Sequence, residues 1–219
     1  MRGADCAIAG QVRRLQARLS ALYVLDLPVD AADYVVDDAG RAALAEALGG
    51  APSADREALW VHEEEDALNV ALCVADELAG GDALDDADLD RYCALLEGVS
   101  HLVYLFDRAL RRVRLTLLEM ELQAEVDKFL TTWFARHDAQ VPVSAGDLRH
   151  RLFVQVSIPP RRDASEEARY RAANRYAARY CGHLQRRYLR AGRVHAMLAE
   201  VRRFWRMDQA TKIAHIEAC

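Results

Sequence analysis

The segment Glu97-Gly-Val-Ser-His101 places a carboxylate and an imidazole four residues apart in an apolar stretch that predicts a helix. Side chains at this spacing lie on one helical face, so the two groups are able to act together. Glu121 and Glu125 repeat the spacing in the next predicted helix. Carboxylates and imidazoles that face each other across two helices are the ligands of helical-bundle metal centres. Glu97, His101, Glu121 and Glu125 are therefore candidate metal ligands.

Three features of the sequence oppose a metal centre. The bundle motif Glu-x-x-His has a spacing of three residues, whereas Glu97 and His101 are four apart, and no second copy of the motif occurs. Arg108 falls on the predicted face of His101 and would repel a cation. Polar pairs at this spacing are also common on solvated helix surfaces. The sequence alone therefore favours a structural pair on the polar side of its helix, where Glu97 holds His101 or an arginine of the C-terminal part.

A row of basic residues in a long predicted helix at 163–190 is a second candidate site. Its members are Arg171, Arg175, Arg179, His183, Arg186 and Arg190. Tyr176, Tyr180 and Tyr188 lie on the adjacent strip, and arginines beside tyrosines are able to grip phosphates and stack on bases. This row is therefore a candidate anion or nucleic-acid site. The alternative is that the tyrosines pack inward while the arginines face water or the acidic part of the chain.

Other catalytic and cofactor motifs are absent from the sequence. The five cysteines are scattered without a C-x-x-C pair, which is typical of reduced thiols in a cytoplasm. No serine lies in a Gly-x-Ser-x-Gly elbow, and neither Gly49-Gly50 nor Gly80-Gly81 begins a phosphate-binding loop. We therefore expect no cofactor, and the sequence does not favour an enzyme.

Composition indicates a globular protein and excludes two other classes. The chain has 219 residues, of which 52% are apolar and 29% charged, so it is able to bury a substantial core and is not disordered. No apolar run approaches the roughly 18 residues that a membrane span requires. Arginine and alanine are abundant, as expected of a GC-rich bacterial genome. These features predict a bacterial cytoplasmic protein with no membrane association.

Charge is distributed unevenly along the chain. Residues 1–146 carry 13 Lys and Arg against 27 Asp and Glu, whereas residues 147–219 carry 16 against 7. Such a split has two explanations: the basic part docks on the acidic part of the same molecule, or it offers a surface to an anionic partner. The first explanation is the simpler and is favoured.

Hydrophobic periodicity predicts a single α+β domain, predominantly helical. It comprises an N-terminal helix and small sheet over 1–79 and a helical bundle over 80–219. The predicted helices cover residues 7–25, 41–48, 88–112, 115–136, 163–190 and 192–208, followed by a final short helix. Residues 59–62 and 68–74 read as a β-hairpin, and residues 34–36 join it in a small antiparallel sheet. Residues 147–158 fit either a helix or a strand, and we favour a helix that Pro159-Pro160 ends.

The sequence thus favours a non-enzymatic accessory or regulatory protein that binds a macromolecular partner, most simply another protein or a second copy of the chain. A carboxylate/histidine di-metal enzyme is the first alternative. Nucleic-acid binding through the helix at 163–190 is the second.

Overall fold

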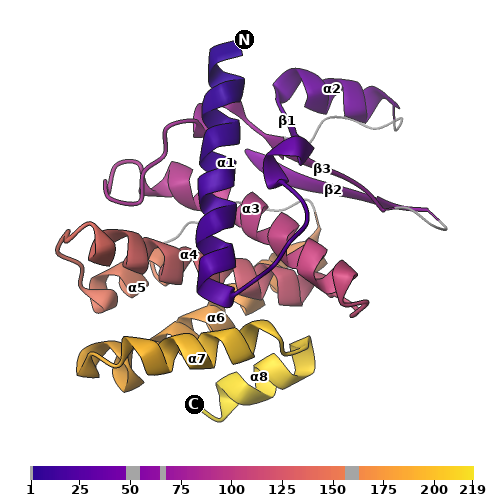
Figure 1. Ribbon diagram of the computed structural model, residues 1–219. Helices are drawn as coiled ribbons and strands as arrows, with labels where there is room; N and C mark the ends of the chain where they lie inside the picture. Colours follow the sequence, from indigo (N-terminus) through magenta and orange to yellow (C-terminus); the bar gives the residue numbers. More distant parts are fainter. Residues whose placement is uncertain (1, 48–54, 65–67, 156–162) are drawn as a thin grey trace.

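The computed structural model describes residues 2–47, 55–64, 68–155 and 163–219 (Figure 1). Within these ranges the fold is predominantly helical with a small sheet, which confirms the predicted class. The helices are α1 (Arg2–Tyr23), α2 (Asp38–Ala47), α3 (Leu89–Leu110), α4 (Leu117–Asp138), α5 (Ala145–Phe153), α6 (Ala164–Arg187), α7 (Val194–Trp205) and α8 (Gln209–Glu217). The strands are β1 (Val35–Val36), β2 (Glu57–Glu63) and β3 (Leu68–Val74), and short 3-10 turns are η1 (Ala31–Tyr34), η2 (Asp76–Leu78) and η3 (Leu189–Ala191). The ends expected for two helices, at Gly49-Gly50 and at Pro159-Pro160, lie outside the described residues.

The sheet is mixed, with the strand order β1-β3-β2. The predicted hairpin is confirmed, since β2 and β3 pair antiparallel with Glu57 opposite Val74 and Glu63 opposite Leu68. The prediction of an entirely antiparallel sheet is wrong, because β1 pairs parallel to β3. The chain passes through α2 between β1 and β2, and this crossover brings β1 to the far side of β3 in the parallel direction.

Helix α3 is the central element and is buried on nearly every side. It contacts α1 and α4 as well as strands β2 and β3. Its apolar residues Leu96, Val99 and Leu102 are fully buried, and Gly98 lets the sheet approach closely, because a Cβ there would lie 2.7 Å from Leu72 Cδ1 and 2.8 Å from Glu57 Oε2. The absence of a side chain at Gly98 therefore leaves room for the ends of the Leu72 and Glu57 side chains against α3.

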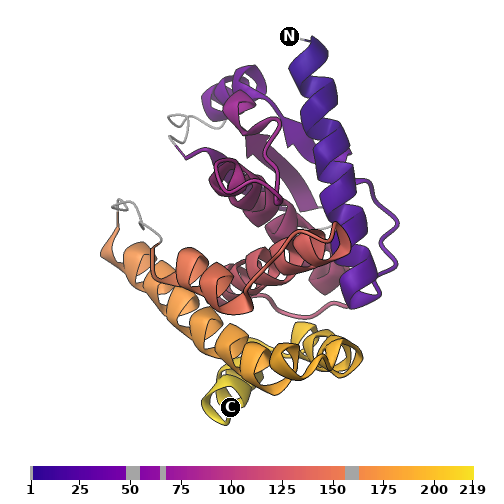
Figure 2. The same ribbon diagram turned by 90° about the vertical axis from the view of Figure 1, so that its left-hand side faces the viewer.

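Helix α4 runs back along α3 and joins it to the C-terminal helices (Figures 1 and 2). The side chain of Thr116 caps its start by accepting a hydrogen bond from the Glu119 amide at 3.1 Å. On its other side α4 packs against α6 and α5, while α7 and α8 lie beyond at the end of the molecule opposite the N-terminus. One cluster of buried side chains extends from Ile8 in α1 to Ile216 in α8.

The Asp127 network ties these layers together through buried polar side chains, namely Tyr23, Ser100, Gln123, Asp127 and Lys212. Asp127 accepts hydrogen bonds from Tyr23, from Ser100 Oγ (2.6 Å) and from Gln123 Nε2 (2.9 Å). Lys212 Nζ donates to Gln123 Oε1 at 2.6 Å. The network therefore connects α1, α3, α4 and α8 through groups that all have hydrogen-bond partners.

Two boundaries in the C-terminal part refine the predictions. Residues 145–153 form α5, so the helical interpretation of the ambiguous segment is confirmed for its described part, and residues 156–158 lie outside it. The long basic helix is capped by Asp163, at the start of the predicted range 163–190, but ends at Arg187, so Arg190 lies in the following 3-10 turn rather than in the helix. None of the helices in the described ranges is both long and apolar enough to cross a bilayer.

Candidate metal centre

Three of the four predicted metal ligands converge between α3 and α4. Glu97 and His101 come from successive turns of α3, and Glu121 comes from the facing turn of α4. One ligand atom of each residue lies within 4.8 Å of the other two, and His101 Nε2 is 3.4 Å from Glu121 Oε2. The positions of these three residues on two antiparallel helices are sufficient to bring an imidazole and two carboxylates to one point.

Glu125, the fourth predicted ligand, is held by a lysine instead. Lys128 Nζ lies 2.8 Å from Glu125 Oε1 and 2.5 Å from Glu97 Oε2, so it bridges the two carboxylates. All three side chains are largely buried. Lys128 compensates the charge of Glu125, which does not belong to the group of converging ligand atoms. The arrangement therefore offers one group of three ligands rather than the two sites of a di-metal bundle.

Glu57, at the start of β2, completes an acidic cluster that we define as Glu57, Glu97, His101 and Glu121. Its Oε2 atom is buried and has no hydrogen-bond partner among the described residues. Sequence reasoning missed this residue, because nothing distinguishes Glu57 from the other acids of the hairpin until the hairpin is placed on α3. The one indirect signal was Gly98, a glycine within a helix that permits a close approach.

The acidic cluster opens into a cavity of about 500 Å³ between the hairpin, α3, α4 and the start of α6. Arg169 and Tyr170 of α6 line its far wall. Arg169 Nε lies 3.7 Å from Glu121 Oε1 but, like His101 Nε2, forms no hydrogen bond of good geometry with any described residue. Buried polar atoms without partners are rare in proteins and point to a missing ligand.

Crowded carboxylates perturb the ionisation of the acidic cluster. Burial raises the pKa of Glu57 to about 8, and the neighbouring Glu97 charge adds to the shift. Burial alone would lower the pKa of His101, but the charges of Glu121, Glu57 and Glu97 outweigh it and raise that pKa to about 9. Burial and like charges also raise the pKa of Glu125 despite the attraction of Lys128. The carboxylates and the imidazole of the cluster therefore hold on to their protons, because few other positive charges lie close enough to offset the negative ones.

The donor set suits a divalent transition metal. A site that combines an imidazole nitrogen with carboxylate oxygens suits zinc, iron or manganese better than it suits calcium or magnesium. Ligands at about 2.0–2.2 Å from one tetrahedral ion lie about 3.3 Å apart, close to the observed 3.4 Å between His101 Nε2 and Glu121 Oε2. Small shifts of Glu97 away from Lys128 would close a three-ligand site, with the remaining coordination positions facing the cavity.

The structure corrects two sequence-based interpretations of this region. The face of α3 that carries His101 and Arg108 is not solvated, since both residues are buried against the rest of the fold. Arg108 does not repel a cation at His101, because it is bound to Glu119 and to Tyr104 Oη (2.6 Å) instead. The nearest partners also differ from those expected: Glu97 pairs with Lys128, and the arginine of the C-terminal part that enters the site, Arg169, pairs with Glu121.

Comparisons with known protein families, with curated proteins and with solved structures found no match for this chain. Its function is therefore argued from its own residues.

The predicted basic row on α6 is divided between two environments. The five arginines are exposed, and within the described ranges none of them pairs with a carboxylate of residues 1–146. His183 turns inward, with Nε2 3.0 Å from Glu200 Oε1, and does not belong to the exposed row. Tyr180 and Tyr188 are buried, as the inward-packing alternative predicted.

Charge attraction contributes little to the docking of the C-terminal part. Arg151 and Arg169 reach the acidic part, at Asp86 (3.2 Å) and Glu121 (3.7 Å) respectively. The main contact, between α6 and α4, buries apolar residues such as Ala177 and Leu184. The basic part therefore packs on the acidic part, as the favoured explanation expected, but mainly through apolar residues, and the exposed arginines of the row face water.

Proposed function

We propose that this chain is a metal-dependent enzyme that binds one divalent transition-metal ion at Glu97, His101 and Glu121. The observation that carries the proposal is the convergence of these three ligands at the wall of an open cavity. Metal sites with three protein ligands and open positions are typical of catalysis, whereas structural sites are closed by four. The cavity would admit the substrate to the open side of the ion.

The protein's own residues support distinct tasks around such an ion. Glu57 faces the ligand group with a carboxyl oxygen that lacks a hydrogen-bond partner, so it is able to bind metal-bound water or act as a further oxygen ligand. Arg169 lies on the cavity wall, where it would orient an anionic group of a substrate. A bound metal polarises an oxygen substrate or lowers the pKa of bound water.

Metal binding is tested on the purified full chain with isothermal titration using Mn²⁺, Zn²⁺ and Fe²⁺, after removal of metals with EDTA. We expect one site per chain for at least one ion. His101→Gln and Glu121→Gln should weaken binding by more than the roughly 10–100-fold that loss of a supporting residue costs. His195→Gln removes an exposed histidine on α7 and is the matched control. Less than about a tenth of an equivalent of metal after purification, together with no titratable site, would overturn the proposal.

Binding of a macromolecular partner, the function favoured by the sequence, is a second proposal. The observation that supports it is the exposure of Arg171, Arg175, Arg179, Arg186 and Arg190 along one side of the molecule. Among the described residues Arg171 pairs with Glu167 of its own helix alone, and Arg179 donates to the Glu217 carbonyl at 2.7 Å. A row that is not neutralised by the acidic part fits an anionic partner.

Retention on a nucleic-acid column separates the two classes of anionic partner. A nucleic-acid binder would elute at a salt concentration that falls sharply in Arg175→Glu with Arg179→Glu. No retention at low salt would leave an acidic protein as the partner, to be recovered by pull-down from a lysate.

We also propose that the protein is bacterial and cytoplasmic. Free thiols are in keeping with a reducing compartment, and the free thiols among the described residues are Cys73, Cys93, Cys181 and Cys219.

A further inference from the structure

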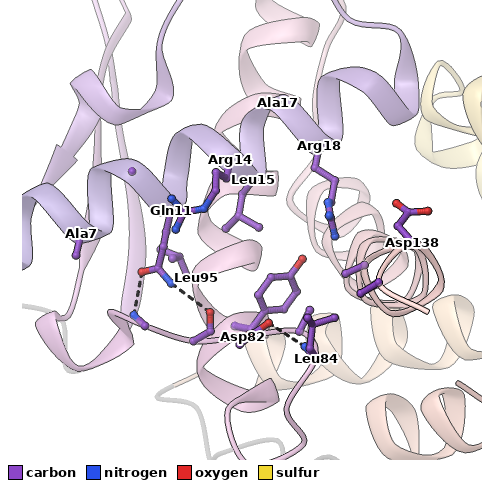
Figure 3. Close-up of a pocket in the computed structure, with 17 residues that line it drawn as sticks. Ala7, Gln11, Arg14, Leu15, Ala17, Arg18, Asp82, Leu84, Leu95 and Asp138 are labelled. Carbon is purple, nitrogen blue, oxygen red and sulfur yellow. Dashed lines mark hydrogen bonds between the residues drawn. The ribbon is translucent and has the colours of Figure 1, made fainter. Parts of the chain in front are cut away.

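A second and larger cavity lies on the other side of α3 from the acidic cluster. Its volume is about 980 Å³, near the upper end of the roughly 300–1,000 Å³ that small-molecule sites span. It lies between α1, the segment 80–84 and the C-terminal end of α4 (Figure 3). It shares no lining residue with the cavity at the acidic cluster.

The floor of this cavity is held in place by Gln11 of α1. The Gly80 amide donates to Gln11 Oε1 at 3.0 Å, and Gln11 Nε2 donates to the Gly81 carbonyl at 3.1 Å (Figure 3). These two hydrogen bonds between the Gln11 side chain and the backbone fix the segment 80–84 relative to α1. Leu15 and Leu95 supply an apolar surface between the polar groups. The cavity is therefore formed before any ligand enters.

Two arginines of α1, one helical turn apart, line the cavity without a carboxylate partner in the described part of the chain. Arg14 has no ion pair there, and Arg18, which also lies beside the Tyr92 hydroxyl, donates a long hydrogen bond from Nη1 to the Thr131 carbonyl at 3.4 Å. Arg13, their neighbour on the same helix, differs because it is bound to Asp30 at 2.6 Å on another face. Two unneutralised guanidinium groups beside an apolar surface are suited to a carboxylate.

The hydroxyl of Tyr92 adds an independent indication of a ligand. Tyr92 lines the cavity, is only 9% exposed, and lies near Arg18 and Thr131. Its oxygen nevertheless forms no hydrogen bond of good geometry with any described residue. Leaving a buried hydroxyl unpaired is costly, and a ligand oxygen beside Arg18 would satisfy it.

We propose that this cavity binds a small organic monoanion, a carboxylate attached to an apolar body. The carboxylate would meet Arg14, Arg18 and the Tyr92 hydroxyl, while the apolar body packs on Leu15 and Leu95. The cavity also has Asp82 and Asp138 on its wall, the latter opposite Arg18 in Figure 3. These acids would repel a ligand with several negative charges, so the site selects against phosphates and nucleotides.

Three probes with the same naphthyl body but different polar groups test the proposal by isothermal titration of the full chain: 2-naphthoate, neutral 2-naphthamide and dianionic 2-naphthyl phosphate. We expect naphthoate to bind about 10-fold or more tightly than the amide, because charge-assisted hydrogen bonds to arginine are worth more than neutral ones. The phosphate should bind less tightly than naphthoate. Affinity should be the same with EDTA and with metal, since the cavity is separate from the proposed metal centre.

Variants locate the binding within the cavity. Arg14→Gln and Arg18→Gln should each weaken naphthoate about 10-fold, whereas Arg13→Gln, the matched control on the same helix, should leave it unchanged. Ala17→Phe places a larger side chain in the cavity from an exposed position, so it should abolish binding while the unfolding midpoint is retained. Absence of naphthoate binding at millimolar concentration, equal binding of the amide, or an equal effect of Arg13→Gln would each overturn the proposal.

Discussion

Helices α3 and α4 bury two groups of polar side chains that differ in how completely they are hydrogen bonded. In the Asp127 network, Asp127 accepts three hydrogen bonds, and Lys212 has an amide oxygen as acceptor. In the acidic cluster, Glu57 Oε2 and His101 Nε2 are buried without a hydrogen-bond partner among the described residues. The network is enclosed by the fold, whereas the cluster lines a cavity.

This difference separates a structural role from a functional one. A network in which every group has a hydrogen-bond partner stabilises and orders the elements that supply it. An incompletely paired group of like charges stores an unfavourable free energy that a cation would relieve. Polarity alone therefore does not identify a site; the degree of pairing does.

The largest expected effect is on the Asp127 network. Asp127→Ala would leave Tyr23, Ser100 and Gln123 without their shared acceptor, so we expect the free energy of unfolding to fall by about 3–5 kcal/mol. Urea unfolding followed by circular dichroism measures the loss. A loss below about 1 kcal/mol would show that the network does not stabilise the fold and would break the comparison.

The next effect is the stabilisation by metal of the acidic cluster. At a free metal concentration about 100-fold above Kd, the unfolding free energy should rise by about 2.7 kcal/mol. Glu121→Gln should lose this increment, while Asp127→Asn, destabilised in the network, should retain it. The same increment in both variants would contradict the separation of the two groups.

A third effect concerns the pH dependence that Lys212 confers. Burial lowers its pKa from the ordinary lysine value of about 10.4 to about 7 in the folded protein. Between these values the unfolded chain binds more protons, so stability rises with pH by at most about 1.4 kcal/mol per unit. The unfolding free energy of the parent minus that of Lys212→Met, measured at pH 7, 8 and 9, should therefore increase as the pH rises. A constant difference would contradict the shift.

The smallest expected effect belongs to Glu57. In the metal-free protein, Glu57→Gln removes a buried acid from among like charges, so the unfolding free energy should be unchanged or raised by up to about 1 kcal/mol. Glu63→Gln, at the exposed end of the same strand, is the control. If Glu57→Gln lowered the unfolding free energy by more than about 2 kcal/mol, Glu57 would have a structural role like that of the Asp127 network.

The sequence contained most of the elements and part of the candidate site. Periodicity located α3, α4 and the hairpin, because each has a long and regular pattern. The convergence of Glu97, His101 and Glu121 required only that two antiparallel helices face each other. The parallel pairing of β1 could not be predicted, since a strand of two residues carries no signal of its direction.

The parts that the sequence did not reveal depend on contacts between distant segments. Glu57 reaches the cluster only because the hairpin lies against α3, some forty residues later in the chain. The polar face of α3 was expected in solvent because an amphipathic pattern assumes a single buried side, whereas α3 is enclosed by several neighbours. The second cavity joins Arg14 and Tyr92, whose proximity no local pattern encodes.

Gly98 has a consequence for recognising distant relatives of this chain. Because even one methyl group at this position would collide with the ends of the Leu72 and Glu57 side chains, a sequence with alanine there must move the Glu57 carboxylate. Such a protein could preserve every helix and still lack Glu57 as the fourth member of the acidic cluster. A glycine ten positions into the central helix, one residue after a glutamate, is thus a compact marker for chains able to assemble the same set of groups.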